Sequence, residues 1–105
     1  MKRITQRSIY RTTLLAAIIS LSTAYTVQAQ SGMASYYGGR GGGMTCAHRT
    51  AAMGSVLTVS YGGRTIQCRV NDRGPFVRGR IVDLSMSAAR ALGMTRSGVV
   101  PVSVY

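Results

Sequence analysis

The sequence predicts a small, mainly β protein: a barrel of short strands accompanied by one short helix. Residues 56–61 are rich in β-branched and aromatic side chains, as strands are. Residues 64–71 alternate apolar and polar side chains, so one face of that segment is expected to be buried. The two glycines at 62–63 suit a tight turn between these strands. Short strands, many glycines and a single helix together favour a small barrel.

The remaining strands are expected at residues 32–37, 81–82 and 99–105. Pro101 has no amide hydrogen to donate, which places it at the start or edge of the last strand. Residues 38–43 contain five glycines and predict a loop, because glycine loses the most backbone freedom on ordering.

One helix is predicted at about residues 85–92. Gly93 follows it and is a typical C-terminal stop, since glycine adopts the left-handed conformation there without strain. Asp83 and Ser85 are both candidates for the residue that caps its N-terminus.

Residues 1–29 are interpreted as a secretory signal peptide, which leaves one domain at residues 30–105. The segment combines a basic start, an apolar stretch at residues 14–24 and small residues before a cut after Ala29. An uncleaved membrane anchor is the alternative, but the apolar stretch is shorter than the roughly 20 residues that span a bilayer. We therefore expect an exported protein of the periplasm or cell envelope, with no stable membrane anchor after cleavage.

The chain has two cysteines, Cys46 and Cys68, and both lie in the predicted domain. Export to an oxidising compartment favours a disulfide between them. A metal pair and a thiol nucleophile formed by Cys46 with His48 are the alternatives. Two cysteines and one histidine are too few ligands for a closed zinc site.

The predicted domain is strongly basic, with nine arginines and no lysine against two aspartates. Such a surface favours anionic partners. Export makes nucleic acid a poor candidate, and the carboxylates of peptidoglycan stem peptides or anionic lipid headgroups fit better.

Acid–base chemistry in this domain must use Asp72, Asp83 or His48, its only carboxylates and histidine. Asp72 lies just after a predicted strand, in the kind of loop that often displays functional groups. A turn-forming role for Asp72, a capping role for Asp83 and a structural role for His48 are the alternatives.

Four motifs occur in order along the domain: Met-Ala-Ser-Tyr-Tyr-Gly at 33–38, Ala-His-Arg-Thr at 47–50, Val-Asn-Asp-Arg-Gly-Pro-Phe at 70–76 and Gly-Arg-Ile-Val-Asp-Leu-Ser at 79–85. In these motifs and their spacing the chain resembles the rare lipoprotein A (RlpA) family. The resemblance implies a six-stranded double-psi β-barrel. It also implies an endolytic lytic transglycosylase that cleaves peptidoglycan glycan strands, preferably those lacking stem peptides, to 1,6-anhydro-muramic ends.

The same resemblance implies a catalytic set that includes Asp72 and His48. In the related expansin and family 45 glycosidase barrels the key acid corresponds to Asp83, so both aspartates are retained as candidates and Asp72 is ranked first. No metal or organic cofactor is implied. The implied partners are peptidoglycan glycan strands and, beyond them, cell-division or other envelope proteins.

The candidate glycan-binding residues are Tyr36, Tyr37, Arg49 and Arg73, with one of the two tyrosines expected to face the core. The chain departs from the family pattern where a Glu is usual, because residues 38–44 contain no acid. Hydrolysis normally needs two carboxylates, whereas anhydro-forming cleavage can use one. A non-catalytic, expansin-like glycan-binding module is therefore the alternative, and an inhibitor or scaffold that binds proteins is a third hypothesis.

Overall fold

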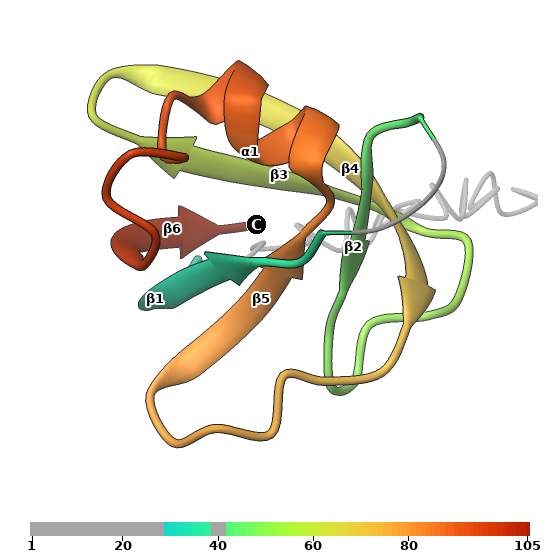
Figure 1. The fold of residues 1–105 in the computed structure, drawn as a ribbon. Helices are drawn as coiled ribbons and strands as arrows, with labels where there is room; N and C mark the ends of the chain where they lie inside the picture. The colour runs from blue at the N-terminus through green and yellow to red at the C-terminus, as the bar shows by residue number, and fades with distance from the viewer. Residues whose placement is uncertain (1–28, 39–41) are drawn as a thin grey trace, which may run out of the picture.

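The computed structural model describes residues 29–38 and 42–105, which form one closed barrel of six strands with a helix against it (Figure 1). The elements are β1 (Gln30–Tyr36), β2 (Thr45–Ala47), β3 (Val56–Tyr61), β4 (Arg64–Asp72), β5 (Arg80–Leu84), α1 (Met86–Leu92) and β6 (Val100–Val104). Around the barrel the strands run in the order β1-β5-β2-β4-β3-β6. The predicted fold class, a six-stranded barrel with one short helix, is confirmed.

The signal peptide predicted from the first 29 residues falls, except for Ala29, outside the described residues, as do residues 39–41 of the glycine-rich segment. Among the residues that are described, no helix is long and apolar enough to cross a bilayer.

The hairpin of β3 and β4 forms as the sequence predicts. Val56 to Tyr61 pair antiparallel with Arg64 to Arg69, and both turn glycines have positive φ, 56° at Gly62 and 81° at Gly63. Two successive positive φ values match the twist of the adjoining strands, which explains the glycine pair. On β4, every second side chain from Ile66 to Val70 is buried.

The sequence did not predict β2, and it predicted only residues 81–82 of the five-residue strand β5. Residues 45–47 form β2, which pairs parallel with β4 and antiparallel with β5. A three-residue strand is too short for any alternation to be recognised, and its partners come from distant parts of the chain. Tertiary pairing alone defines it.

Helix α1 lies across one side of the barrel, where it contacts β4, β2 and β5 (Figure 1). Of the two candidate caps, the structure uses Ser85, whose hydroxyl accepts a hydrogen bond from the Ala88 amide at 3.2 Å. Asp83 lies in β5 instead, so its prediction as a cap is wrong. Gly93 ends the helix in the left-handed conformation with φ of 80°, as predicted.

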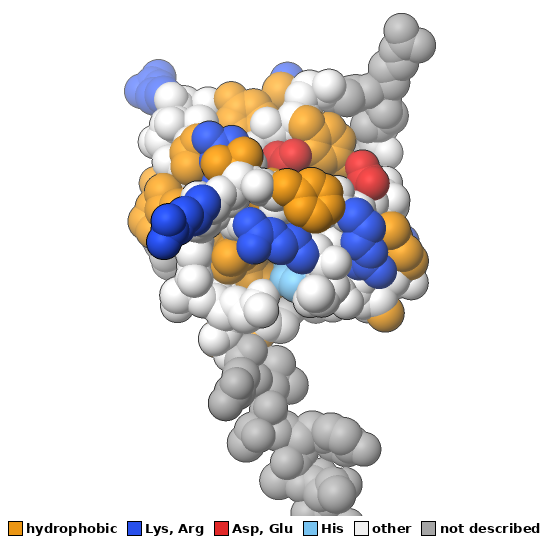
Figure 2. Space-filling view, turned by 90° about the horizontal axis from the view of Figure 1, so that it is seen from below, with side chains coloured by type: hydrophobic (Ala, Val, Ile, Leu, Met, Phe, Trp, Pro, Cys, Tyr) orange, Lys and Arg blue, Asp and Glu red, His pale blue; other side chains and the backbone are white. Residues whose placement is uncertain are grey.

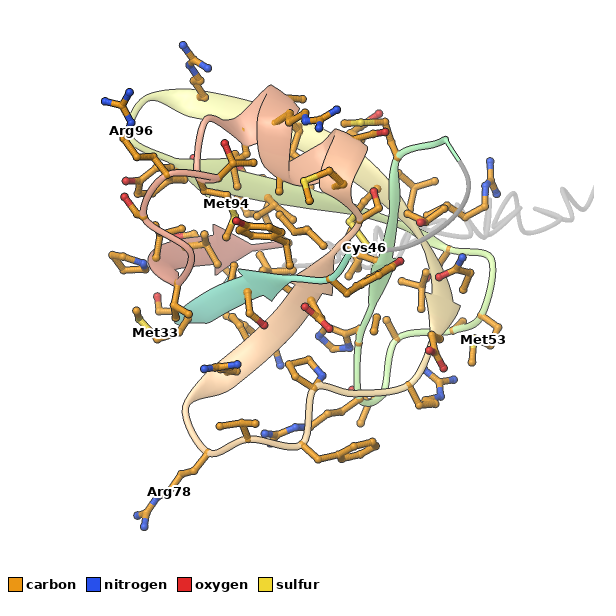
Figure 3. All side chains as sticks on the ribbon, viewed as in Figure 1. Met33, Cys46, Met53, Arg78, Met94 and Arg96 are labelled. Carbon is orange, nitrogen blue, oxygen red and sulfur yellow. A yellow bond between two sulfur atoms is a disulfide. The ribbon has the colours of Figure 1, made fainter. Side chains whose placement is uncertain are left out.

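The barrel interior is filled by aliphatic side chains and the two cysteines. The largest fully buried side chains are Leu84, Leu92, Met94, Val59, Val70, Val82, Cys46 and Cys68. Figure 3 shows Met94 and Cys46 inside the fold, whereas Arg78 and Arg96 point outward. Cys46 on β2 and Cys68 on β4 form a disulfide that closes a loop with a sequence separation of 22. The predicted disulfide is present, so neither cysteine is a free thiol or a metal ligand.

Replacing both cysteines by alanine is expected to lower the free energy of unfolding by about 2–4 kcal/mol, because the crosslink restricts the unfolded chain. Urea unfolding of the oxidised wild type and of Cys46→Ala/Cys68→Ala measures the difference. Reduced wild type is the control and is expected to resemble the double variant. Equal midpoints for all three proteins would contradict a stabilising role for the disulfide.

Candidate functional site

A groove of about 440 Å³ opens along β2, beside the last residues of β4 and β5 and the start of α1, and we call it the acidic groove. It is lined by Tyr37, Thr45, Ala47, Asn71, Asp72, Arg73, Gly74, Pro75, Phe76, Asp83, Ser85 and Met86. Both aspartates of the chain therefore contribute to one groove. Figure 2 shows the two acidic side chains on the same face, with hydrophobic side chains and arginines around them.

Strand register explains why the two aspartates meet. Ala47 on β2 is paired with Asp72 on β4 and also with Asp83 on β5. The two acids therefore stand on either side of Ala47, two strand spacings apart, which corresponds to about 10 Å between their Cα atoms. Ala47 lines the acidic groove between the two aspartates, and its small side chain leaves the groove open there.

Asp83 is the more enclosed of the two carboxylates. Burial raises the pKa of Asp83, and the negative charge of Asp72 raises it further. The hydroxyl of Ser35 donates a hydrogen bond to Asp83 Oδ1 at 3.0 Å, and this bond, together with the charge of Arg80, lowers the pKa in part. Burial is the largest of these effects, so Asp83 holds a proton to higher pH than an ordinary aspartate.

Asp72 has an exposed side chain at the end of β4. Its Oδ1 accepts a hydrogen bond from the backbone amide of Arg73 at 2.8 Å, and its main-chain carbonyl accepts one from the His48 amide at 3.1 Å. This bond reaches the next residue, whereas a turn-forming aspartate bonds the amide two residues on. The two carboxylates therefore share one groove but occupy different environments.

His48 lies outside the acidic groove, in a smaller hollow lined by Gln30, Arg49, Thr50 and Ile81. Its Nδ1 accepts hydrogen bonds from the amides of Thr50 and Ala51 at 3.2 and 2.9 Å. The ring proton is therefore assigned to Nε2, which donates to Gln30 Oε1 at 2.9 Å. Burial lowers the pKa of His48, and the positive charges of Arg73 and Arg49 lower it further. The structure thus gives His48 a neutral, fully engaged ring that does not line the groove.

Arg49, a predicted glycan-binding residue, donates hydrogen bonds to the loop that follows β4. Its Nε donates to the Pro75 carbonyl at 2.7 Å. One of its terminal nitrogens donates to the carbonyls of Val77 and Arg80 at 3.1 and 3.2 Å. Arg49 does not line the acidic groove but anchors one of its walls.

Arg73 lines the acidic groove and also binds the main chain. Its guanidinium donates to the carbonyls of His48 and Ala51. Both predicted glycan-binding arginines are thus engaged with backbone oxygens, which fixes the loops around the groove.

The two tyrosines make different contacts, with Tyr36 as the last residue of β1 and Tyr37 just after it. Tyr36 packs against the core and donates its hydroxyl to the Thr95 carbonyl at 2.8 Å. Tyr37 lines the acidic groove, where its hydroxyl lies 3.2 Å from that of Thr45. Of this pair, only Tyr37 is placed to contact a ligand in the groove.

Several groove residues were not among the predicted site residues. Ser85 accepts hydrogen bonds from the amides of Thr45 and Ala88 and donates to the Gly43 carbonyl at 2.8 Å, so it joins β2 to α1. Phe76 belongs to one of the four sequence motifs, and its position after a Gly-Pro turn was the available signal. Within the described ranges, no three His, Cys, Asp or Glu side chains come together as a metal site would require.

Comparison with protein families assigns the fold. Residues 29–104 match the family model described as "Lytic transglycolase". The chain belongs to this RlpA-type double-psi β-barrel family. The match covers all six strands and every residue that lines the acidic groove.

Curated RlpA-type relatives agree with this assignment. The chain is 45% identical over 91 residues to a protein of Nostoc sp. named probable endolytic peptidoglycan transglycosylase RlpA, a match that covers 70% of this chain and 24% of the relative. It is 48% identical over 61 residues to the Campylobacter jejuni endolytic peptidoglycan transglycosylase RlpA, covering 56% of this chain and 22% of that protein. The chain therefore spans about a quarter of the length of these relatives.

Three solved structures share the barrel. The apo expansin of Clavibacter michiganensis has a TM-score of 0.63 and 28% identity, covering 74% of this chain and 50% of the expansin. A mutant of that expansin in complex with cellohexaose gives a TM-score of 0.64 and 25% identity, with the same coverage. The Streptomyces papain inhibitor is also similar, with a TM-score of 0.60 and 27% identity, covering 73% of this chain and 92% of the inhibitor.

The environment of His48 predicts acid sensitivity. Because the pKa of His48 is lowered in the folded protein, below its ordinary value of 6.5 the unfolded chain binds the proton more readily than the folded one. The contribution of His48 to stability is therefore present above pH 6.5 and is lost as the pH falls through its folded pKa.

His48→Asn tests this prediction, since an asparagine oxygen can accept the same amide hydrogens but does not titrate. Melting temperatures between pH 8 and pH 5 are compared, and the loss on acidification is expected to be smaller in the variant. Asp83 is present in both proteins, so the difference reports His48. Parallel pH curves would show that His48 titrates in the folded state as it does in the unfolded chain.

Proposed function

We propose that this domain is an endolytic lytic transglycosylase of peptidoglycan in which Asp83 is the general acid and base. The observation that carries the proposal is the pairing of two carboxylates in one groove, of which the half-buried Asp83 has its pKa raised. A catalytic acid must be protonated at the working pH, and burial is the usual way in which a carboxyl acquires that property. The names of the relatives supply the substrate class.

The proposed reaction uses one carboxyl twice. Protonated Asp83 gives its proton to the glycosidic oxygen, and the bond from that oxygen to C1 of the muramic sugar breaks. The resulting Asp83 carboxylate then takes the proton of the C6 hydroxyl of that sugar, whose oxygen bonds to C1. The products are a 1,6-anhydro end and a free hydroxyl on the leaving sugar, and no water is consumed. Because one carboxyl serves both steps, the Glu that family members carry near residues 38–44 is not required.

Asp72 has a supporting role in this proposal, which reverses the ranking made from the sequence. Its negative charge raises the pKa of Asp83. A carboxylate that faces the groove also stabilises the positive charge that develops on the sugar in an oxocarbenium-like transition state. Tyr37 and Arg73 line the same groove and are proposed to contact the glycan.

His48 is proposed to act as a positioning residue. Its ring nitrogens are engaged with Gln30, Thr50 and Ala51, and its amide binds the carbonyl of Asp72. This arrangement supports the end of β4, and thereby Asp72, without placing the imidazole in the groove.

The place of action follows from the substrate. We propose that residues 1–29 direct export and are removed after Ala29, so that the domain acts in the periplasm. The partners proposed from the resemblance, cell-division or other envelope proteins, remain a prediction.

A glycan-binding module without catalysis is the second candidate. The similarity to an expansin solved with cellohexaose supports binding of a β-linked glycan in this barrel. In that case the acidic groove would hold the glycan and release it uncut.

Denuded peptidoglycan strands incubated with residues 30–105 are expected to give 1,6-anhydro-muramic ends, detected by mass spectrometry. Asp83→Asn is expected to lower the rate by at least about 100-fold, the usual contribution of a general acid. Asp72→Asn is the matched control, because it removes a carboxylate from the same groove and is expected to retain part of the activity.

Three results would contradict the proposal in different ways. Activity that survives in Asp83→Asn but vanishes in Asp72→Asn would make Asp72 the acid. Reducing ends in place of anhydro ends would indicate hydrolysis with water activated by a second carboxylate. Intact strands together with saturable binding to sacculi would favour the binding module.

The pH profile provides an independent test. If activity needs protonated Asp83, the rate falls as the pH rises through the pKa of Asp83. Ser35→Ala removes a hydrogen bond that lowers this pKa, so the alkaline limb of the profile should move to higher pH. Asp72→Asn removes a charge that raises it, and the limb should move to lower pH. Shifts of both variants in the same direction would exclude Asp83 as the titrating acid.

A further inference from the structure

Phe76 is an exposed aromatic ring at the edge of the acidic groove. Its exposed fraction is 78%, the largest among the exposed large hydrophobic residues that the structure describes. Its neighbour Val77 is 51% exposed but does not line the groove. An exposed phenyl ring keeps a large apolar surface in contact with water, and covering that surface with a ligand is favourable. Phe76 is therefore a candidate for ligand contact.

The backbone on both sides of Phe76 is anchored, although most of the side chain is exposed. Arg49 donates to the carbonyls of Pro75 and Val77, the residues before and after it. The ring lies next to Gly74, where an added Cβ atom would be in ordinary van der Waals contact with Phe76 Cε2, at 3.5 Å. Gly74 has φ of 118°, a conformation that favours glycine. The loop therefore holds the main chain around Phe76 in a defined place, so little backbone order would have to be imposed when a ligand binds.

The chemistry around the ring suits a sugar. Beside Phe76 the groove carries the polar groups of Asn71, Asp72, Thr45 and Asp83, which can bind hydroxyl groups. A pyranose ring has an apolar face of C–H groups and a rim of hydroxyls, and it therefore matches one aromatic surface flanked by hydrogen-bonding side chains. A protein partner would instead be expected to cover the adjoining Val77, which is also exposed but is not part of the groove lining.

We propose that Phe76 is a stacking platform that binds one pyranose ring of the glycan and sets the position of the scissile bond relative to Asp83. The inference rests on the proposed function for the identity of the glycan, but it concerns binding and not bond cleavage. It adds to the acidic groove a contact residue that the sequence-based set of Tyr36, Tyr37, Arg49 and Arg73 did not include.

The chain contains no tryptophan, so a single introduced tryptophan is a specific reporter. Phe76→Trp and Val77→Trp are made in the Asp83→Asn background, which separates binding from turnover. Titration with denuded glycan strands is expected to give a saturable blue shift of tryptophan emission for position 76 and no change for position 77. Circular dichroism confirms that both variants are folded.

Affinity measurements complete the test. Phe76→Ala is expected to weaken glycan binding by about 3- to 10-fold, the equivalent of one aromatic contact, whereas Phe76→Tyr restores it and Val77→Ala leaves it unchanged. If glycan binds but the emission of the tryptophan at position 76 does not change, the stacking role of Phe76 is wrong, and the proposed activity is unaffected. Equal responses at both positions would mean general adhesion to this face and would also overturn it. Absence of any glycan binding by the parent protein would remove this proposal and the proposed function together.

Discussion

The pairing of β2 between β4 and β5 is the constraint on which the rest of the site depends. β2 has only three residues, yet it brings the ends of two longer strands into line, and Ala47 is the shared partner of Asp72 and Asp83. A slip of one residue would turn Ala47 to the other face of the sheet and separate the two acids. Such a short strand has few hydrogen bonds of its own, so its register must be held by other means.

Two sets of contacts hold that register. The disulfide links Cys46, the middle residue of β2, to Cys68 in the interior of the barrel. At the start of β2, the backbone carbonyl of Thr45 accepts from the Ser85 amide, and the Ser85 hydroxyl accepts from the Thr45 amide. Ser85 also caps α1, so the start of the helix, β2 and the acidic groove form one unit. The same few residues therefore stabilise the fold and position the site.

The arginines have a structural role that the composition of the chain does not reveal. Their number suggests a surface for anionic partners. In the structure, Arg49, Arg69 and Arg73 each donate to main-chain carbonyls of neighbouring loops. The planar guanidinium suits this use, because it can donate in several directions at once. Part of the basic charge thus serves to fix the loops around the acidic groove, including the segment that presents Phe76.

The sequence by itself determined the elements that depend on neighbouring residues: the hairpin of β3 and β4 with its two glycines, and the helix that ends at Gly93. Its motifs also placed the chain in the correct family and singled out both aspartates. Tertiary structure alone decided the strand β2 and which carboxyl is shielded, because pairing register and burial depend on residues far apart in the chain. It also turned His48 away from the groove and Phe76 toward it. Local pattern predicts which residue types are present, whereas the closure of the barrel decides what each side chain faces.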